Sequence, residues 1–198
     1  MGGVWRQAGL DVLYACWASF GLVWLAGAAW NARAGPRPVT RRRRSAALVV
    51  VGLLAWAVLR FLPRGARTWG TVDAWEVEAA GMVVLVAMTA ATLWARGALG
   101  TMWSSAAVVK DHHALRTTGP YAIVRHPIYT GLLGMLGGTA LIAGLGVWVV
   151  LVVAAACLFQ VKLRAEERLL AATFGPAYGE YASRVPRLIP GTRLGCRR

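Results

Sequence analysis

The chain has 198 residues, of which 58% are hydrophobic, 22 are basic and eight are acidic, so its formal net charge is +14. Its mean hydropathy is +0.53. A soluble nucleic-acid-binding domain would also be basic, but it would space its apolar residues at helix or strand periods. Here they stand in long uncharged blocks, which excludes a water-soluble globular fold and indicates an integral membrane protein.

The first three uncharged blocks occupy residues 12–30, 46–59 and 79–95. The second extends to residue 62 if the Arg60 side chain reaches the interface. A bilayer core of about 30 Å needs about 20 apolar helical residues, so each block predicts a transmembrane helix. Residues 1–28 have a basic residue, an apolar core and an Ala26-Gly27-Ala28 ending, loosely like a signal peptide. Their apolar run is long for a signal peptide, and we therefore expect an uncleaved first helix.

A fourth block, residues 127–161, holds 35 residues without a formal charge. As one helix it would be about 50 Å long, which tilt alone does not accommodate. The turn residues "AGLG" at 143–146 divide it, because glycine accepts the positive φ of a reversal. We therefore expect five transmembrane helices, the last two forming a helical hairpin. Gly134 and Gly138 form a G-x-x-x-G pair, which either lets the hairpin arms approach closely or is merely tolerated in a membrane helix.

The basic residues are divided unevenly along the chain. Segments 31–44, 96–126 and 160–198 together hold 18 of the 22 lysines and arginines. Because cytoplasmic loops are enriched in Lys and Arg, we expect these segments in the cytoplasm, with the N-terminus outside and the C-terminus cytoplasmic. The expected location is the cell or inner membrane. The four arginines at 41–44 then anchor the topology at anionic lipid, and nucleic acid is not an expected partner.

Two other site classes find little support in the sequence. Ionisable residues are scarce in the middle of the predicted helices, which argues against an ion-coupled transporter. The cysteines Cys16, Cys157 and Cys196 form no C-x-x-C pair, so neither a disulfide framework nor a metal site is predicted.

Polar residues concentrate in two stretches, and the first contains "TTGPYAIVRHPIYTG" at 117–131. Pro127 suits the first turn of a helix, where its missing N–H costs nothing. That helix start offers free N–H groups and a partial positive charge to an anion. Tyr121, Arg125, His126 and Tyr129 surround it. These residues fit a binding site and a membrane-interface belt equally well.

The second stretch, residues 160–191, continues the fifth helix out of the membrane. We expect that helix to run to about Thr173 and to end at the "FGP" of 174–176. Glu166 and Glu167 form a carboxylate pair, and Lys162 is placed for an i,i+4 salt bridge with Glu166. The following "YGEYASRVPRLIP" is aromatic and apolar, and we expect it to turn back over the membrane surface as a lid.

The two stretches together resemble the isoprenylcysteine carboxyl methyltransferase family. The resemblance is carried by "TGPYAIVRHPIYTG" and, about 35 residues later, by "EERLLAATFGPAYGEYASRVPRLIP", and it covers roughly residues 110–191. It implies an all-α membrane methyltransferase that uses S-adenosylmethionine. It also implies membrane helices at 1–99, a catalytic region at 100–198, and a cytoplasmic cofactor pocket formed by segments 100–131 and 160–191.

The resemblance also implies roles for individual residues. By motif position, the expected cofactor-binding residues are His113, Leu115, Tyr121, His126, Pro127, Tyr129, Glu166 and Glu167. Glu166 suits the ammonium of the cofactor, and Pro127 contributes mainly backbone. Relatives place an arginine, which serves the substrate carboxylate, four residues before the first glutamate, and this chain has Lys162 there. We therefore expect Lys162, Arg164 and Arg125 to hold acidic groups at the catalytic centre.

Three functions of the protein remain open. The first is methylation of a prenylated thiol or isoprenoid carboxylate that enters from the bilayer, past Trp94, Trp103 or Trp148. The second is methylation of a phospholipid amine or a small thiol, in which Glu167 with Tyr178 or Tyr181 could hold a cation. The third is a membrane scaffold or transporter. Membrane lipids and a lipophilic acceptor are the expected partners, and no sequence signal indicates an oligomeric state.

Overall fold

The computed structural model describes residues 2–34, 70–100 and 115–192, and residues 52, 53, 57, 60, 61 and 63 between them. Its helices are α1 (Gly2–Ala34), α4 (Trp75–Leu99), α5 (Pro120–Ile123), α6 (Pro127–Ile142), α7 (Val147–Phe174) and α8 (Pro176–Arg184). Within these residues there is no β-strand, only an isolated bridge between Thr71 and Leu145. The all-α prediction is confirmed for this part of the chain.

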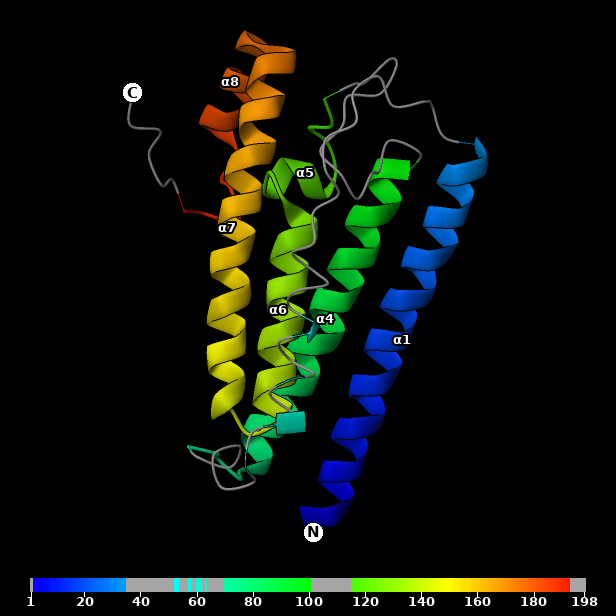
Figure 1. Ribbon diagram of the computed structural model, residues 1–198, viewed down its shortest axis with the longest axis vertical. Coiled ribbons are helices and arrows are strands. Elements are labelled where there is room, and N and C mark those ends of the chain that lie inside the picture. The colour runs from blue at the N-terminus through cyan, green and yellow to red at the C-terminus, as the bar shows by residue number, and fades with distance from the viewer. Residues whose placement is uncertain are drawn as a thin grey trace.

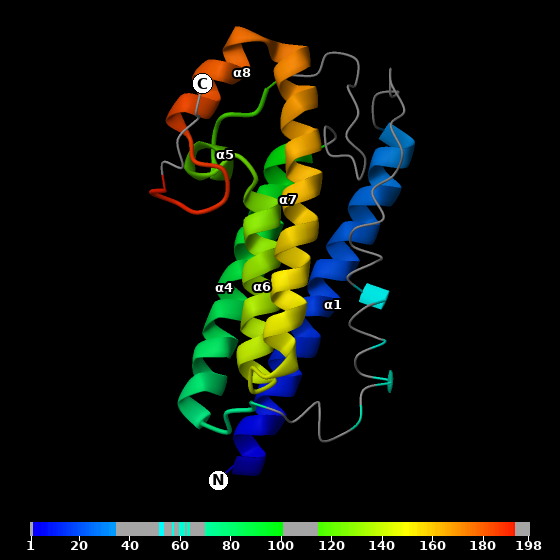
Figure 2. The ribbon, with the colours of Figure 1, turned by 60° about the vertical axis from the view of Figure 1, so that its left-hand side comes forward.

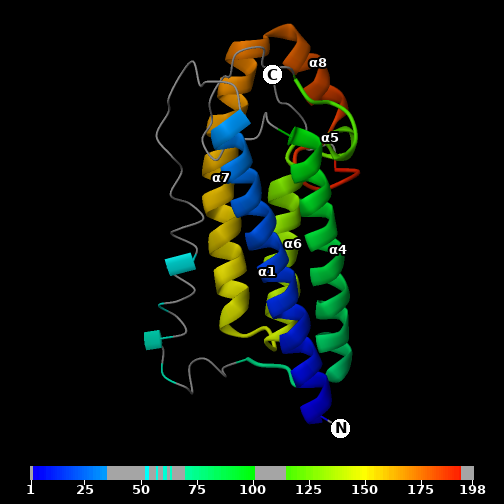
Figure 3. The same ribbon diagram turned by 90° about the vertical axis from the view of Figure 1, so that its right-hand side faces the viewer.

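The four long helices α1, α4, α6 and α7 run side by side as an elongated bundle (Figure 1). The helices α1, α4 and α7 point in one direction along the bundle and α6 runs in the opposite one (Figures 1 and 3). The short helices α5 and α8 cover the end at which α6 begins and α7 ends (Figure 2). The N-terminus lies at the other end.

Three helical segments are long and apolar enough to cross a membrane, namely Trp5–Asn31, Trp75–Leu99 and Val147–Phe174. The apolar helix α6 has 16 residues, which at about 1.5 Å per residue is about 24 Å, short of a hydrocarbon core of about 30 Å. The predicted helix at 46–62 lies outside the described residues for most of its length. The chain is thus an integral membrane protein whose described residues include three such candidate spans, and the count of five stays a prediction.

The helical hairpin is formed by α6 and α7, as the sequence predicts. The reversal occupies residues 143–146, where Gly144, Leu145 and Gly146 have φ of 83°, 66° and 52°. This left-handed backbone is the reason for the two glycines. The Val72 N–H donates to the Gly144 carbonyl at 2.9 Å and ties the turn to the segment before α4.

The glycine face of α6 packs against α4, so the prediction that Gly134 and Gly138 bring the hairpin arms together is wrong. A Cβ atom added at Gly138 would lie 2.8 Å from the backbone N of Leu85 and 2.9 Å from the carbonyl oxygen of Gly81. A Cβ atom at Gly134 would meet the Met88 side chain. Without side chains on this face the two backbones approach closely, and α4 with α6 makes the most extensive interhelical contact.

The helix α1 completes this part of the bundle. Cys16, Leu85 and Met135 form a buried cluster that joins α1, α4 and α6. The Trp17 indole Nε1–H donates to the Thr139 hydroxyl at 3.1 Å. These contacts fix α6 along its length and so hold its first turn, where the polar motif lies, at one end of the bundle.

Basic side chains gather at that same end. Arg33 lies in the last turn of α1 and Arg96 in the last turn of α4. Lys162 and Arg164 lie in the half of α7 that approaches this end, whereas Arg6 lies in the opposite half of α1. Arg33, Arg96, Lys162 and Arg164 thus lie toward one end and Arg6 toward the other, while the division of all basic residues and the assignment of one end to the cytoplasm stay predictions.

Candidate functional site

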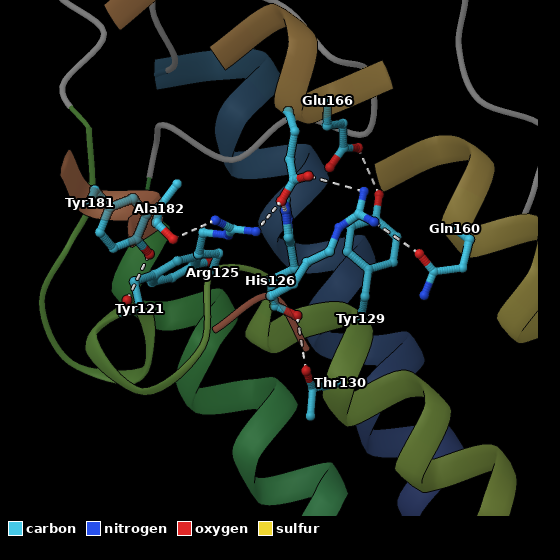
Figure 4. A network of polar contacts seen from close by, with 11 residues as sticks. Tyr121, Arg125, His126, Tyr129, Thr130, Gln160, Glu166, Tyr181 and Ala182 are labelled. Atoms are coloured by element: carbon cyan, nitrogen blue, oxygen red, sulfur yellow. Dashed lines mark hydrogen bonds and ion pairs between the residues drawn. The ribbon is translucent and has the colours of Figure 1, made fainter. Parts of the chain in front are cut away.

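The polar residues of the two sequence stretches meet where α6 begins and α7 leaves the bundle (Figure 4). Two prolines set the backbone here, since Pro120 opens α5 and Pro127 opens α6. Proline is favoured at a first helical turn because its missing N–H would have no helical partner. The chain therefore turns twice within ten residues and presents Arg125, His126 and Tyr129 toward α7.

Glu166 contacts Tyr129 and Lys162. Its Oε1 atom accepts a hydrogen bond from the Tyr129 hydroxyl at 2.7 Å and lies 3.7 Å from Lys162 Nζ. The Lys162 ammonium also lies over the Tyr129 ring, 5.2 Å from its centroid, in a cation–π contact. The i,i+4 salt bridge predicted from the sequence is confirmed. The Glu166 side chain is 21% exposed, so its carboxylate stands at the border between protein and surroundings.

Glu167 has different neighbours. Its Oε1 atom lies 3.0 Å from Arg125 Nη2 and 3.2 Å from His126 Nε2, and its Oε2 atom lies 3.1 Å from Arg187 Nη2. The His126 side chain is buried, at 7% exposure. Successive residues of a helix point about 100° apart, which separates the two glutamates. The carboxylate pair therefore serves two different clusters.

The chain after α8 docks onto the motif. The backbone N–H groups of Arg125 and His126 donate to the carbonyls of Pro186 and Arg187 at 2.8 and 3.2 Å. The Thr130 hydroxyl donates to the Leu188 carbonyl at 2.7 Å. The predicted return of this segment toward the membrane end is thus realised as a direct attachment to the start of α6, and its role as a lid stays a prediction.

The buried tyrosines strengthen this attachment. The Tyr181 hydroxyl donates to the Tyr121 carbonyl at 2.7 Å, which joins α8 to α5. Burial raises the pKa of Tyr181 to about 12, so its hydroxyl keeps its proton and remains a donor at neutral pH. Tyr178 packs edge-on against Tyr181 with ring centroids 6.2 Å apart. Burial raises the pKa of the Tyr178 hydroxyl as well.

Most of the predicted site residues come together, and some do not. The structure gathers Tyr121, Arg125, His126, Pro127, Tyr129, Lys162, Glu166 and Glu167 at one end of the bundle. Leu115 is half-buried, and Arg164 is exposed on α7. His113 lies outside the described residues. The predicted pocket between segments 100–131 and 160–191 depends in part on residues 101–114, which also lie outside them.

The structure adds residues that the sequence reasoning missed. Arg187 contacts Glu167 and also donates from Nη1 to the side-chain oxygen of Gln160 at 3.0 Å. Arg125, expected to hold an acidic group of a ligand, instead donates to the Ala182 carbonyl at 2.9 Å and pairs with Glu167. The sequence feature that could have indicated Arg187 is its position within "RVPRLIP", where two prolines favour an extended chain.

Two acceptor-side expectations do not match the geometry. Glu167 is contacted by Arg125 and Arg187, so its surroundings are cationic and do not suit a cage for an amine with Tyr178 or Tyr181. Trp148 lies in the first turn of α7, at the opposite end of the bundle from the site. Trp103 lies outside the described residues, and Trp94 is more than half exposed on α4, near Gly119.

The fold and the site together define a class of protein. It is a small helical membrane protein that gathers an Arg-His-Pro-x-Tyr motif and a Glu-Glu pair from two helices of a hairpin at one end of the bundle. The chain belongs to the isoprenylcysteine carboxyl methyltransferase family, whose profile matches residues 79–172.

Three relatives illustrate the range of this similarity. The chain is 38% identical over 98 residues to the cobalt-zinc-cadmium resistance protein CzcN of Cupriavidus metallidurans, which is 48% of this chain and 45% of that protein. It is 30% identical over 167 residues to the nickel-cobalt-cadmium resistance protein NccN of Alcaligenes xylosoxydans xylosoxydans, which is 81% and 72%. It is 35% identical over 82 residues to protein-S-isoprenylcysteine O-methyltransferase B of Arabidopsis thaliana, which is 41% and 42%. The match thus spans less than half the length of the first and third relatives.

Proposed function

We propose that the protein is an S-adenosylmethionine-dependent methyltransferase that acts on a lipophilic acceptor at the membrane border. The single observation that carries the proposal is the contact between the two halves of the family motif. Tyr129 in the first turn of α6 donates to Glu166 on α7 at 2.7 Å, across 37 residues of sequence.

The side chains present fit the charged groups of such a cofactor. S-adenosylmethionine carries an ammonium, a carboxylate and a sulfonium. Glu166 offers a partly exposed carboxylate, whose present cationic neighbour is Lys162 at the long distance of 3.7 Å. The ammonium of the cofactor would be a second cation for this carboxylate. The first turn of α6 would face the carboxylate of the cofactor.

The proposed methyl transfer requires little acid–base catalysis from the side chains of this protein. The bound cofactor supplies a methyl group on a positively charged sulfur. Glu166 and Tyr129 bind and orient, and the apolar faces of α6 and α7 exclude water from the reacting groups. Lys162 would bind the acidic head group of the acceptor after its salt bridge with Glu166 has opened. No nucleophilic side chain is needed when the acceptor is already a carboxylate or a thiolate.

For the acceptor we propose a lipophilic carboxylate, such as that of a prenylated thiol, which enters laterally from the bilayer. The Lys162 ammonium favours an acceptor with an acidic head group. The guanidinium groups beside Glu167 disfavour binding of a phospholipid amine there. A small thiol remains the second candidate.

Two relatives are named for metal resistance, but the described residues contain no group of three His, Cys, Asp or Glu side chains that could hold a metal ion. For topology we propose that the site end faces the cytoplasm.

Binding of S-adenosylhomocysteine to the purified protein tests the cofactor. Hydrogen bonds to a charged group contribute about 1.5–3 kcal/mol, so we expect Glu166→Gln and Tyr129→Phe to weaken binding by about tenfold or more. Glu180→Gln is the matched control, because Glu180 forms an exposed i,i+4 pair with Arg184 on α8. Wild-type affinity in Glu166→Gln would show that this carboxylate is not the cofactor site.

Transfer of a radiolabelled methyl group tests the acceptor. A farnesylated cysteine analogue, phosphatidylethanolamine and a small thiol are offered in parallel. We expect label on the farnesylated analogue that base releases, because a methyl ester is base-labile. Stable label on the amine or on the thiol would replace the proposed acceptor without removing the methyltransferase.

A further inference from the structure

Glu167 differs from Glu166 in that two guanidinium groups flank it. Arg125 and Arg187 lie 3.0 and 3.1 Å from its two oxygens. Two adjacent cations favour the ionised carboxylate, and an ionised carboxylate can only accept hydrogen bonds. The His126 Nε2 atom lies 3.2 Å from Glu167 Oε1. Nε2 must therefore carry a proton and donate it to this hydrogen bond.

A neutral imidazole has one N–H, so a donor at Nε2 leaves Nδ1 as an acceptor. We infer that Glu167 is a positioning residue that fixes His126 in the Nε2–H tautomer and presents Nδ1 as an acceptor to a group bound at the start of α6. The inference rests on the proposed function and on the sequence prediction that His126 is a cofactor-binding residue. It revises the sequence prediction that Glu167 itself touches the cofactor.

His126 is held from several directions, as a positioned ring requires. Its backbone N–H donates to the Arg187 carbonyl at 3.2 Å, on the segment after α8. Its ring packs edge-on near Tyr129, with centroids 6.1 Å apart. Glu167 binds the ring from α7 and also binds the Arg187 side chain. One carboxylate thus fixes the ring and the chain segment that covers its backbone.

The inference narrows the chemistry of the bound group. An Nδ1 acceptor takes a hydrogen bond from an N–H or O–H, such as the ammonium, amino or hydroxyl groups of a nucleoside-containing cofactor. It does not bind a carboxylate. The carboxylate of the cofactor is then left to the first turn of α6, so the two ends of the amino-acid part of the cofactor are bound by different groups of the protein.

Nitrogen-15 NMR of histidine-labelled protein in lipid nanodiscs tests the tautomer without any ligand. The chain has three histidines, and His126→Asn assigns the signal. We expect the neutral ring of wild-type His126 to carry its proton on Nε2. In Glu167→Gln the amide can donate or accept, so the tautomers should mix. Glu180→Gln should leave the wild-type pattern. A proton on Nδ1 in the wild type, or an unchanged pattern in Glu167→Gln, would overturn the inference.

Cofactor affinity gives a second measurement. Loss of a carboxylate partner of a metal-binding histidine costs about 10–100-fold, and we expect Glu167→Gln to weaken S-adenosylhomocysteine binding by a factor of that order. If the wild type binds and Glu167→Gln binds equally well, the positioning role is wrong. If the wild type does not bind, the proposed function fails instead. Because the wild-type tautomer is measured without the Glu167→Gln variant, the test survives a Glu167→Gln protein that does not fold.

Discussion

A methyl group added at Gly138 should damage the contact between α4 and α6 more than the same group added at the preceding residue, Gly137. At Gly138 the new Cβ atom would lie 2.8 Å from the backbone N of Leu85 and 2.9 Å from the carbonyl oxygen of Gly81. Backbone atoms of a packed helix cannot rotate away, so the helices have to separate. At Gly137 an added Cβ atom would have no neighbour within 4 Å.

The two alanine variants share one favourable effect, because alanine in place of glycine stabilises a helix by up to about 1 kcal/mol. Their difference therefore isolates the clash. Overpacking of a core costs about 1–3 kcal/mol, and for a chain of this size 1 kcal/mol shifts Tm by about 2–4 °C. We expect Gly138→Ala to melt about 2–12 °C below Gly137→Ala. Gly134→Ala should fall between them, because its neighbour is the flexible Met88 side chain.

Thermal unfolding of the three variants in one detergent, followed by circular dichroism, gives the comparison. Equal melting temperatures for Gly138→Ala and Gly137→Ala would refute the close approach of α4 and α6. A larger loss in Gly137→Ala would show that a different face of α6 carries the contact. Binding of S-adenosylhomocysteine by each folded variant separates a loss of stability from a loss of the site.

Two further variants test contacts that hold the site in place. Trp17→Phe removes the hydrogen bond to Thr139 and should lower the free energy of unfolding by about 0.5–1.5 kcal/mol, with unchanged affinity for S-adenosylhomocysteine; a change in affinity without a change in melting temperature would contradict this. Arg187→Gln removes a partner of Glu167 and should loosen the segment after α8, which limited proteolysis or hydrogen exchange of residues 185–192 detects. Arg184→Gln is its control, because the Arg184 pair is about 70% exposed on both sides and such pairs contribute little. Equal protection in both variants would show that the Arg187 contact does not hold the segment.

Features that depend on neighbours in sequence could be predicted. The uncharged blocks predicted the long helices, and the 143–146 turn follows from the φ values that only a few residue types adopt easily. The end of α7 at Phe174 follows from the Gly-Pro beyond it. The Lys162–Glu166 pair follows from helix geometry. Each of these is set within one or two helical turns, so the chain outside that window has little influence on it.

The division of roles between the two glutamates could not be predicted in this way. Adjacent residues on a helix point to different sides, and which side meets the motif depends on the rotation of α7 in the bundle. Arg187 reaches Glu167 only because the chain after α8 folds back onto residues 125–130. The resemblance to the family named the two glutamates but not their partners.

The sequence alone determined that this is a helical membrane protein, that a polar motif opens α6, and that the family signature spans the hairpin, because these depend on local composition and order. The tertiary structure alone decided that the glycines of α6 face α4, that Arg125 is held by Glu167 and Ala182, and that Arg187 joins the site. The physical reason is distance along the chain. Thr130 and Leu188 are 58 residues apart, and Tyr121 and Tyr181 are 60 apart, so only the packing of whole helices brings them into contact.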